Sequence, residues 1–107
     1  MAFTRVAAVD DLWRGEMTAV VAGGVTIVLV YLDDGIRAFY DRCAHLGVPL
    51  SQGRLAGHVL TCSAHQWQYD ARTGAGINPA EVRLRPLPLR IAGGQVFVDP
   101  AAVAAAS

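Results

Sequence analysis

The chain has 107 residues, and nine Arg balance nine Asp and Glu, so the formal net charge is zero without any Lys. A chain of this length fits one domain, and we predict a single domain over residues 1–107. The neutral charge excludes the basic stripe that draws proteins onto nucleic acid. Two cysteines are too few for a small secreted disulfide scaffold, which favours a cytoplasmic location.

The N-terminal third predicts neither an export signal nor a membrane span. Asp10, Asp11 and Glu16 interrupt any apolar stretch near the start, and no small-residue cleavage pattern follows. Asp10 can cap a helical turn over residues 10–17. The apolar run over residues 17–32 is rich in β-branched residues and divided by two glycines, which indicates two strands and a turn. We therefore expect a soluble protein with no membrane partner.

Short apolar, β-branched runs predict strands along the chain. These runs are residues 17–22, 25–32, 36–40, 59–62, 65–70, 87–92 and 95–99. Gly23-Gly24, Asp33-Asp34-Gly35 and Gly93-Gly94 separate neighbouring runs, which is typical of hairpins. The pattern indicates an all-β fold. The closing Ala-rich residues 101–107 are consistent with a short helix or a frayed tail.

Both cysteines stand next to a histidine where the strand pattern breaks. Cys43-Ala44-His45 lies in one predicted loop and Cys62-Ser63-Ala64-His65 begins another. Thiolates and imidazoles are ligands for iron or zinc, and two such pairs on separate loops can converge on one metal site. Two buried thiols and two ordinary histidines are the simpler alternative, but the paired positions favour a metal site.

Two motifs resemble the cluster-binding loops of Rieske proteins. They are C-x-H-x-G-x-P-L over residues 43–50 and C-x-x-H over residues 62–65. The resemblance implies one [2Fe–2S] cluster, with Cys43 and Cys62 on one iron and His45 and His65 on the other. It also implies the Rieske fold, an antiparallel β-sandwich or barrel-like base with a cluster-binding subdomain. That subdomain would comprise loops at about 41–50 and 62–70 and a covering proline loop at about 73–81.

The resemblance also assigns residues around the four ligands. Leu46 and Gly47 continue the first loop and Pro79 ends the third, so they are expected to cover the cluster. Tyr69 stands where high-potential Rieske proteins have a Tyr that donates a hydrogen bond to sulfur, whereas Trp67 stands at the position of a Ser donor. Trp67 could shield the cluster or could be an ordinary strand-face aromatic residue.

The chain departs from the Rieske pattern in the second loop. Ser63 and Gln66 replace the proline and glycine of the common C-P-x-H-G motif, which leaves the shape of this loop open. One hydroxyl donor fewer predicts a reduction potential near the low end of the Rieske range of about −150 to +300 mV. His58 has no neighbouring cysteine, and we expect it to be an exposed turn residue.

The resemblance implies an electron carrier and not an enzyme. The stretches DDLWRGEM (10–17) and TGAGINP (73–79) are similar to the ferredoxin component of toluene-4-monooxygenase-type systems. Such systems degrade aromatic hydrocarbons, and a flavin-containing NAD(P)H reductase feeds the ferredoxin, which feeds a diiron hydroxylase. We expect these two partners and a monomeric carrier. Three alternatives stay open: the ferredoxin of a Rieske aromatic-ring dioxygenase, the small subunit of a nitrite reductase, and a structural zinc-binding module.

Overall fold

The computed structural model describes residues 3–41, 49–63, 66–78 and 80–100, and within them the chain is built from antiparallel strands. The elements are β1 (Thr4–Ala8), η1 (Val9–Asp11), β2 (Met17–Ala22), β3 (Val25–Leu32), β4 (Gly35–Tyr40), η2 (Leu50–Gln52), β5 (Arg54–Ala56), β6 (Val59–Thr61), β7 (Gln68–Asp70), β8 (Gly76–Asn78), β9 (Leu89–Ala92) and β10 (Gln95–Val98). This confirms the all-β prediction. The strand orders in the three sheets are β1-β10-β9, β2-β3-β4 and β5-β6-β7-β8.

The predicted hairpins are confirmed, and three strands were missed. Gly23 and Gly24 join β2 to β3 with φ of 57° and 77°, a left-handed backbone that glycine adopts without steric cost. The missed strands, β1, β5 and β8, are short or poor in β-branched residues. The helical turn expected over residues 10–17 is only the 3-10 turn η1 at Val9–Asp11. Its N-cap is Ala8, so the prediction that Asp10 caps the turn is wrong, because Asp10 lies inside it. Residues 101–107 lie outside the described residues. Across the described ranges, the structure has no helix with the length and apolar character of a membrane span.

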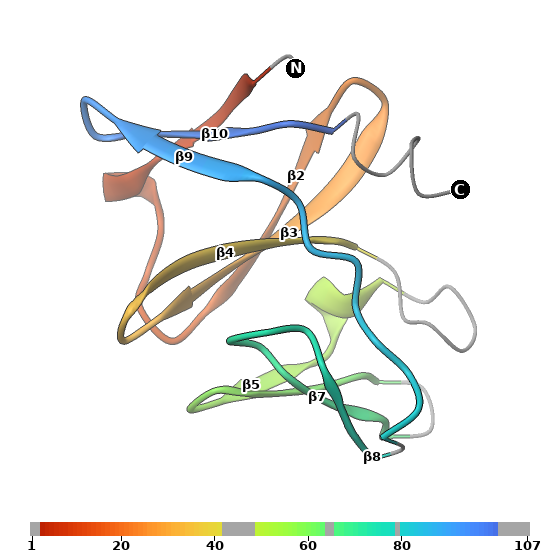
Figure 1. Cartoon of the computed structure of the whole chain (residues 1–107). Coiled ribbons are helices and arrows are strands. Elements are labelled where there is room, and N and C mark those ends of the chain that lie inside the picture. The colour runs from red at the N-terminus through yellow and green to blue at the C-terminus, as the bar shows by residue number, and fades with distance from the viewer. Residues whose placement is uncertain (1–2, 42–48, 64–65, 79, 101–107) are drawn as a thin grey trace.

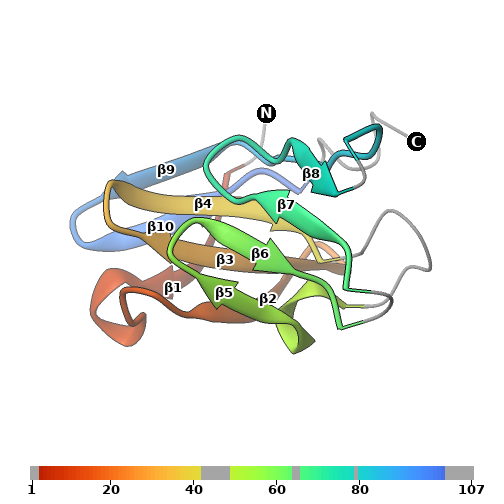
Figure 2. The ribbon, with the colours of Figure 1, turned by 90° about the horizontal axis from the view of Figure 1, so that it is seen from below.

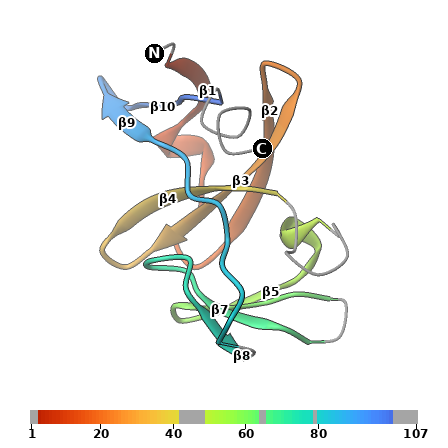
Figure 3. The ribbon, with the colours of Figure 1, turned by 45° about the vertical axis from the view of Figure 1, so that its right-hand side comes forward.

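The β2-β3-β4 sheet lies between the other two sheets, as Figures 1 and 3 show. Successive side chains of a strand point to opposite faces, and β3 is apolar at nearly every position. Val28 and Val30 belong to the core on the side of β5-β6-β7-β8, whereas Ile27 and Leu29 belong to the core on the side of β1-β10-β9. Both faces of this middle strand are therefore buried.

The β5-β6-β7-β8 sheet packs on the middle sheet through its own apolar residues. Figure 2 views the molecule from this side, with β6 and β7 in front of β3 and β4. Leu50, Leu60, Cys62 and Tyr69 are fully buried and share a core with Phe39 of β4. This packing places the predicted ligand Cys62 in the core that the two sheets share.

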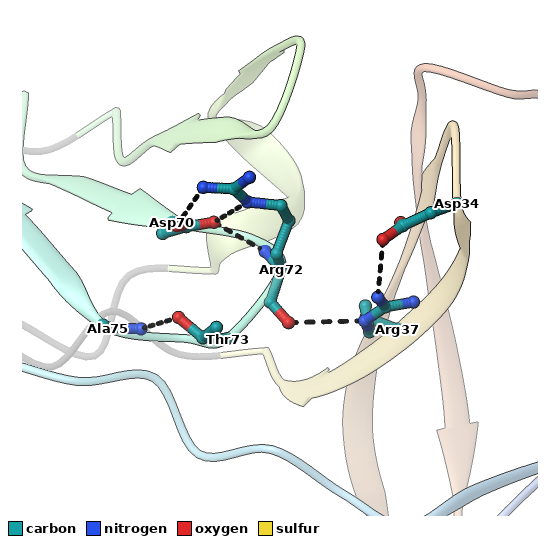
Figure 4. A network of polar contacts seen from close by, with 6 residues as sticks. All are labelled: Asp34, Arg37, Asp70, Arg72, Thr73 and Ala75. Atoms are coloured by element: carbon teal, nitrogen blue, oxygen red, sulfur yellow. Dashed lines mark hydrogen bonds and ion pairs between the residues drawn. The ribbon is translucent and has the colours of Figure 1, made fainter.

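Polar contacts join the turns of these two sheets at one end (Figure 4). Arg37 of β4 pairs with Asp34 at 3.2 Å, and its Nε donates a hydrogen bond to the carbonyl oxygen of Arg72 at 3.3 Å. Arg72, in the turn after β7, donates to the Asp70 carboxylate from Nε and Nη2 at 3.1 and 3.0 Å. The chain of contacts links the β3–β4 hairpin to the β7–β8 turn.

Candidate metal centre

The described residues give the frame of the predicted cluster site. Cys62, Trp67 and Tyr69 are described, whereas Cys43, His45, Leu46, Gly47, His65 and Pro79 lie outside the described residues. The frame consists of the bases of the two predicted ligand loops and the core beneath them.

Two hydrogen bonds close the base of the first loop. Asp41, at the end of β4, is buried, and its carboxylate accepts from the backbone N–H and the hydroxyl of Ser51, each at 2.8 Å. Ser51 belongs to η2, where the neighbouring Leu50 is fully buried. Hydrogen bonds to a charged acceptor are among the stronger ones in proteins. The two ends of the segment that carries Cys43 and His45 are thereby held together.

A backbone hydrogen bond closes the second loop. The Cys62 N–H donates to the carbonyl oxygen of Trp67 at 2.7 Å, directly beyond the paired residues Thr61 and Gln68. The strand predicted over residues 65–70 begins only at Gln68, where the pairing with β6 starts, because the Trp67 carbonyl group accepts from Cys62 at the end of the pair. Gln66 has a φ of 58°, and it is the one non-glycine residue with positive φ in the described ranges. Gln66 therefore has a backbone conformation that favours glycine, at the position where the common C-P-x-H-G motif has its glycine.

The bases of the two loops touch at Gly53. A Cβ atom added there would lie 2.2 Å from the carbonyl oxygen of Thr61, which is far inside van der Waals contact. The φ of Gly53 is −84°, so the position requires glycine for space and not for backbone conformation. The chain leaving the first loop therefore lies directly against the chain entering the second.

The Cys62 side chain fits a metal-bound thiolate. It is fully buried in the apolar core that contains Leu50 and Tyr69. An ionised thiolate is costly in such surroundings unless a cation balances it, and a coordinated iron supplies that balance. The donor type and its burial therefore suit an iron–sulfur group.

The other described residues of the predicted site differ in burial. Tyr69 is fully buried in the same core as Cys62, while Trp67 is half-buried and packs against this core. Trp67 thus takes at least the core-packing role of its two proposed roles. His58 is exposed in the β5–β6 turn, as expected.

Sequence reasoning missed Asp41, Ser51 and Gly53. The signals were present, since Asp41 and Ser51 flank the first motif and Gly53 follows it closely. Polar residues and glycines are common beside loops, however, and only the fold shows that these three meet.

Comparisons with known proteins extend the likeness over almost the whole chain. The ferredoxin component of the alkene monooxygenase system of Xanthobacter autotrophicus is 41% identical over 97 residues, which cover 90% of this chain and 80% of that protein. The ferredoxin of carbazole 1,9a-dioxygenase from Nocardioides aromaticivorans has a similar structure, with a TM-score of 0.85 and 27% identity over 94% of this chain and 99% of that one. Several further relatives are ferredoxin components or subunits of dioxygenases.

A complex of reduced oxygenase and oxidised ferredoxin in carbazole 1,9a-dioxygenase also contains a similar chain. The TM-score is 0.82 with 28% identity, over 90% of this chain and 91% of the matched chain. The Rieske [2Fe-2S] domain model matches residues 2–88, which include both predicted ligand motifs and the closed loop bases described above. This chain belongs to the Rieske [2Fe–2S] family.

Proposed function

We propose that this chain is the electron-carrying ferredoxin of a multicomponent oxygenase system, with Cys43, His45, Cys62 and His65 as ligands of one [2Fe–2S] cluster. The observation that carries the proposal is the 41% identity to the alkene monooxygenase ferredoxin over 90% of this chain. The buried thiol of Cys62 and the hydrogen bond at the base of the second loop also support a metal-binding carrier.

The chain's own residues hold and insulate the site. A [2Fe–2S] cluster with two Cys and two His ligands supplies reversible one-electron storage. The Asp41–Ser51 hydrogen bonds close the first ligand loop, and the close approach of Gly53 to Thr61 sets the spacing between the bases of the two loops. Tyr69 and Leu50 exclude water from the side of Cys62. Burial on the side of Cys62 reduces the solvent rearrangement that a change of charge requires, which suits a carrier.

The partners we propose are a flavin-containing NAD(P)H reductase and the diiron hydroxylase of an aromatic or alkene monooxygenase. A monomer acting in the cytoplasm suits this role. The second candidate is the ferredoxin of a Rieske aromatic-ring dioxygenase, which the structural likeness to the carbazole dioxygenase ferredoxin favours. Family membership weighs against the structural zinc module, and metal analysis decides that point directly.

The first experiment measures the iron and sulfide content of the protein and its reduction potential. We expect the purified protein to contain about two irons and two acid-labile sulfides per chain, and a midpoint potential near the low end of the range of about −150 to +300 mV. The variant Cys62→Ser should lose the cluster, whereas His65→Cys should lower the potential in the fraction that retains it. A protein that contains zinc without sulfide, or an unchanged potential in His65→Cys, contradicts the ligand assignment.

The second experiment measures electron transfer. The reduced protein is mixed with the oxygenase component of the Xanthobacter alkene monooxygenase system and, separately, with that of carbazole 1,9a-dioxygenase, each with its reductase and NADH. We expect faster substrate turnover with the monooxygenase. Faster turnover with the dioxygenase favours the second candidate, and no electron transfer to either oxygenase contradicts the proposed function.

A further inference from the structure

Trp13 is the most exposed of the large apolar side chains in the described part of the chain, with 70% of its surface accessible. It lies in the stretch DDLWRGEM (10–17), to which the cluster site assigns no role. Tryptophan is highly buried on average in folded proteins, and at protein interfaces it often supplies much of the binding energy. The exposure of Trp13 therefore suits a surface that a partner protein covers.

Backbone hydrogen bonds define the turn that presents Trp13. The Glu16 N–H donates to the Trp13 carbonyl oxygen at 3.1 Å, and Gly15, with a φ of 86°, takes the left-handed position of this four-residue turn. The turn is also joined to β3, because the Gly15 N–H donates to the Tyr31 carbonyl oxygen at 2.7 Å and the Tyr31 N–H donates to Glu16 at 3.1 Å. The preceding Leu12 is buried in the core. Trp13 is thus exposed on backbone that is hydrogen-bonded on both sides of it.

Acidic residues dominate the segments around this turn. Exposed carboxyl groups come from η1, from the turn itself and from the adjoining tip of the β3–β4 hairpin: Asp10, Asp11, Glu16, Asp33 and Asp34. The arginines of these segments already have partners, since the Arg14 guanidinium lies 5.7 Å from the centroid of the Tyr31 ring and Arg37 pairs with Asp34. The surface around Trp13 therefore favours a partner with basic residues.

A pocket at the hairpin tip adds a second feature to this surface. Its volume is about 200 Å³, and its lining residues are Leu32, Asp33, Asp34, Gly57, His58 and Arg72. Arg72 pairs with Asp70 and Asp34 pairs with Arg37, whereas Asp33 takes part in neither of these ion pairs of the described residues. A carboxylate in such a pocket suits a Lys or Arg side chain of a partner.

This surface lies at the end of the molecule opposite to Cys62. Figure 2 shows the tip of the β3–β4 hairpin and the β5–β6 turn at one end, and the end of β6, which Cys62 follows, at the other. Electron exchange requires a close approach to the cluster ligands, so a protein bound at Trp13 leaves that end of the carrier accessible. The Trp13 surface therefore suits attachment to a partner and not the electron transfer itself.

We propose that the Trp13 turn docks into an apolar pocket with a basic rim on the terminal oxygenase, and so retains the carrier there between deliveries. The inference rests on the proposed function. A [2Fe–2S] cluster delivers one electron at a time, so the oxygenase needs repeated deliveries, and a contact that spares the cluster end raises the local concentration of the carrier. Reduction by the reductase takes one encounter per electron, which the cluster end alone supplies.

The test compares Trp13→Ala with Ile91→Ala in binding to, and turnover with, the oxygenase component of the Xanthobacter alkene monooxygenase system. Ile91 is also exposed and apolar, but it lies on β9, in a sheet whose strands carry no acidic residue. We expect Trp13→Ala to raise the Kd and the KM for the ferredoxin by at least about tenfold, with kcat unchanged at saturation. Ile91→Ala should stay within about twofold of wild type, and Trp13→Phe should recover part of the affinity.

A charge variant and a stability measurement complete the test. Asp33→Asn should weaken binding severalfold at low ionic strength, and added salt should remove the difference from wild type. The thermal midpoint of Trp13→Ala should equal that of wild type, because the ring is exposed. A Kd of Trp13→Ala equal to that of wild type overturns the docking site, and so does a KM unchanged beside a lower kcat.

Reduction by NADH and the reductase, without oxygenase, separates the possible partners. We expect Trp13→Ala to be reduced at the wild-type rate. A slower reduction assigns the surface to the reductase, and a wild-type dimer that Trp13→Ala converts to a monomer assigns it to a second copy of the chain; either result overturns the proposal. A wild-type protein that is reduced but neither binds the oxygenase nor supports its turnover contradicts the proposed function, whereas a loss confined to the Trp13 and Asp33 variants supports the docking site.

Discussion

At the residue scale, Gly53 and Asp41 hold the two ligand loops by different physical means. Gly53 lets two backbone segments approach so closely that no side chain fits between them. Asp41 supplies a buried carboxylate that accepts both polar hydrogens of Ser51. Gly53 therefore acts through its lack of a side chain, and Asp41 acts through its buried hydrogen-bond acceptor. Substitutions can distinguish these two effects.

Gly53→Ala should destabilise the protein and lower its cluster content. The new Cβ atom would overlap the Thr61 carbonyl oxygen, so the two loop bases must separate. Overpacking of this kind typically costs about 1–3 kcal/mol. The matched control is Gly57→Ala in the β5–β6 turn, where φ is 61° and the space is open, so only the backbone cost of about 1–2 kcal/mol applies.

Iron content and the visible absorption per chain measure the effect on the site. We expect Gly53→Ala to lose cluster, while Gly57→Ala lowers the thermal midpoint and keeps full iron content. Equal iron content in both variants would show that the Gly53 contact does not position the ligand loops.

Asp41→Ala should cost more stability than Ser51→Ala. Removing the carboxylate leaves both the backbone N–H and the hydroxyl of Ser51 without their acceptor, at about 1–3 kcal/mol. Ser51→Ala removes only the hydroxyl bond and keeps the backbone one, at about 0.5–1.5 kcal/mol. Urea unfolding followed by cluster absorption gives both values, with Thr4→Ala in β1 as an exposed control. The reverse order would argue against the carboxylate as the centre of this contact.

At the element scale, the network in Figure 4 joins two turns that belong to different sheets. The β3–β4 hairpin comes from the middle sheet and the β7–β8 turn from the sheet that carries Cys62. The hydrogen bond from Arg72, followed by smaller effects of its backbone N–H and charge, holds the pKa of Asp70 below its ordinary value of 3.8. The ionised form of Asp70 is therefore favoured by the fold.

Asp70→Asn should lower stability by an amount that depends on pH in one direction. A carboxyl whose pKa is lower in the folded state contributes stability above its unfolded pKa and loses it as the pH falls through the folded pKa. The difference in thermal midpoint between wild type and Asp70→Asn should be constant from about pH 8 to about pH 5 and shrink below about pH 4. Arg72→Gln removes the same pair and should give the same profile. A difference that grows toward low pH would contradict this sign.

The strands show which elements can be predicted from sequence. β2, β3 and β10 are runs of apolar and β-branched residues next to glycine turns, and their predicted bounds agree closely with the structure. β5 and β8 have three residues each, Arg54–Ala56 and Gly76–Asn78, and their pairing partners supply most of the order. A short strand defined by its neighbours leaves little signal in its own residues.

At the scale of the whole molecule, the sequence could predict a metal site with Cys and His ligands, but it could not predict the contacts that position the ligand loops. Each cysteine stands two or three positions before a histidine, so the ligand pairs can be recognised without knowledge of the fold. Asp41 and Ser51 are ten positions apart, and nothing in their residue types pairs them. The contact between Gly53 and Thr61 exists only because β5 and β6 fold back on each other. The roles of Cys43, His45 and His65 as ligands stay predictions.

The burial of both faces of the middle strand β3 has a consequence for how the protein unfolds. Ile27 and Leu29 pack in the core beside the β1-β10-β9 sheet, which holds none of the predicted ligands. Val28 and Val30 pack in the core that contains Cys62. Because the same strand contributes to both cores, disruption of one core should destabilise the other. We therefore expect heat or denaturant to unfold the predicted cluster site and the β1-β10-β9 sheet in one cooperative transition.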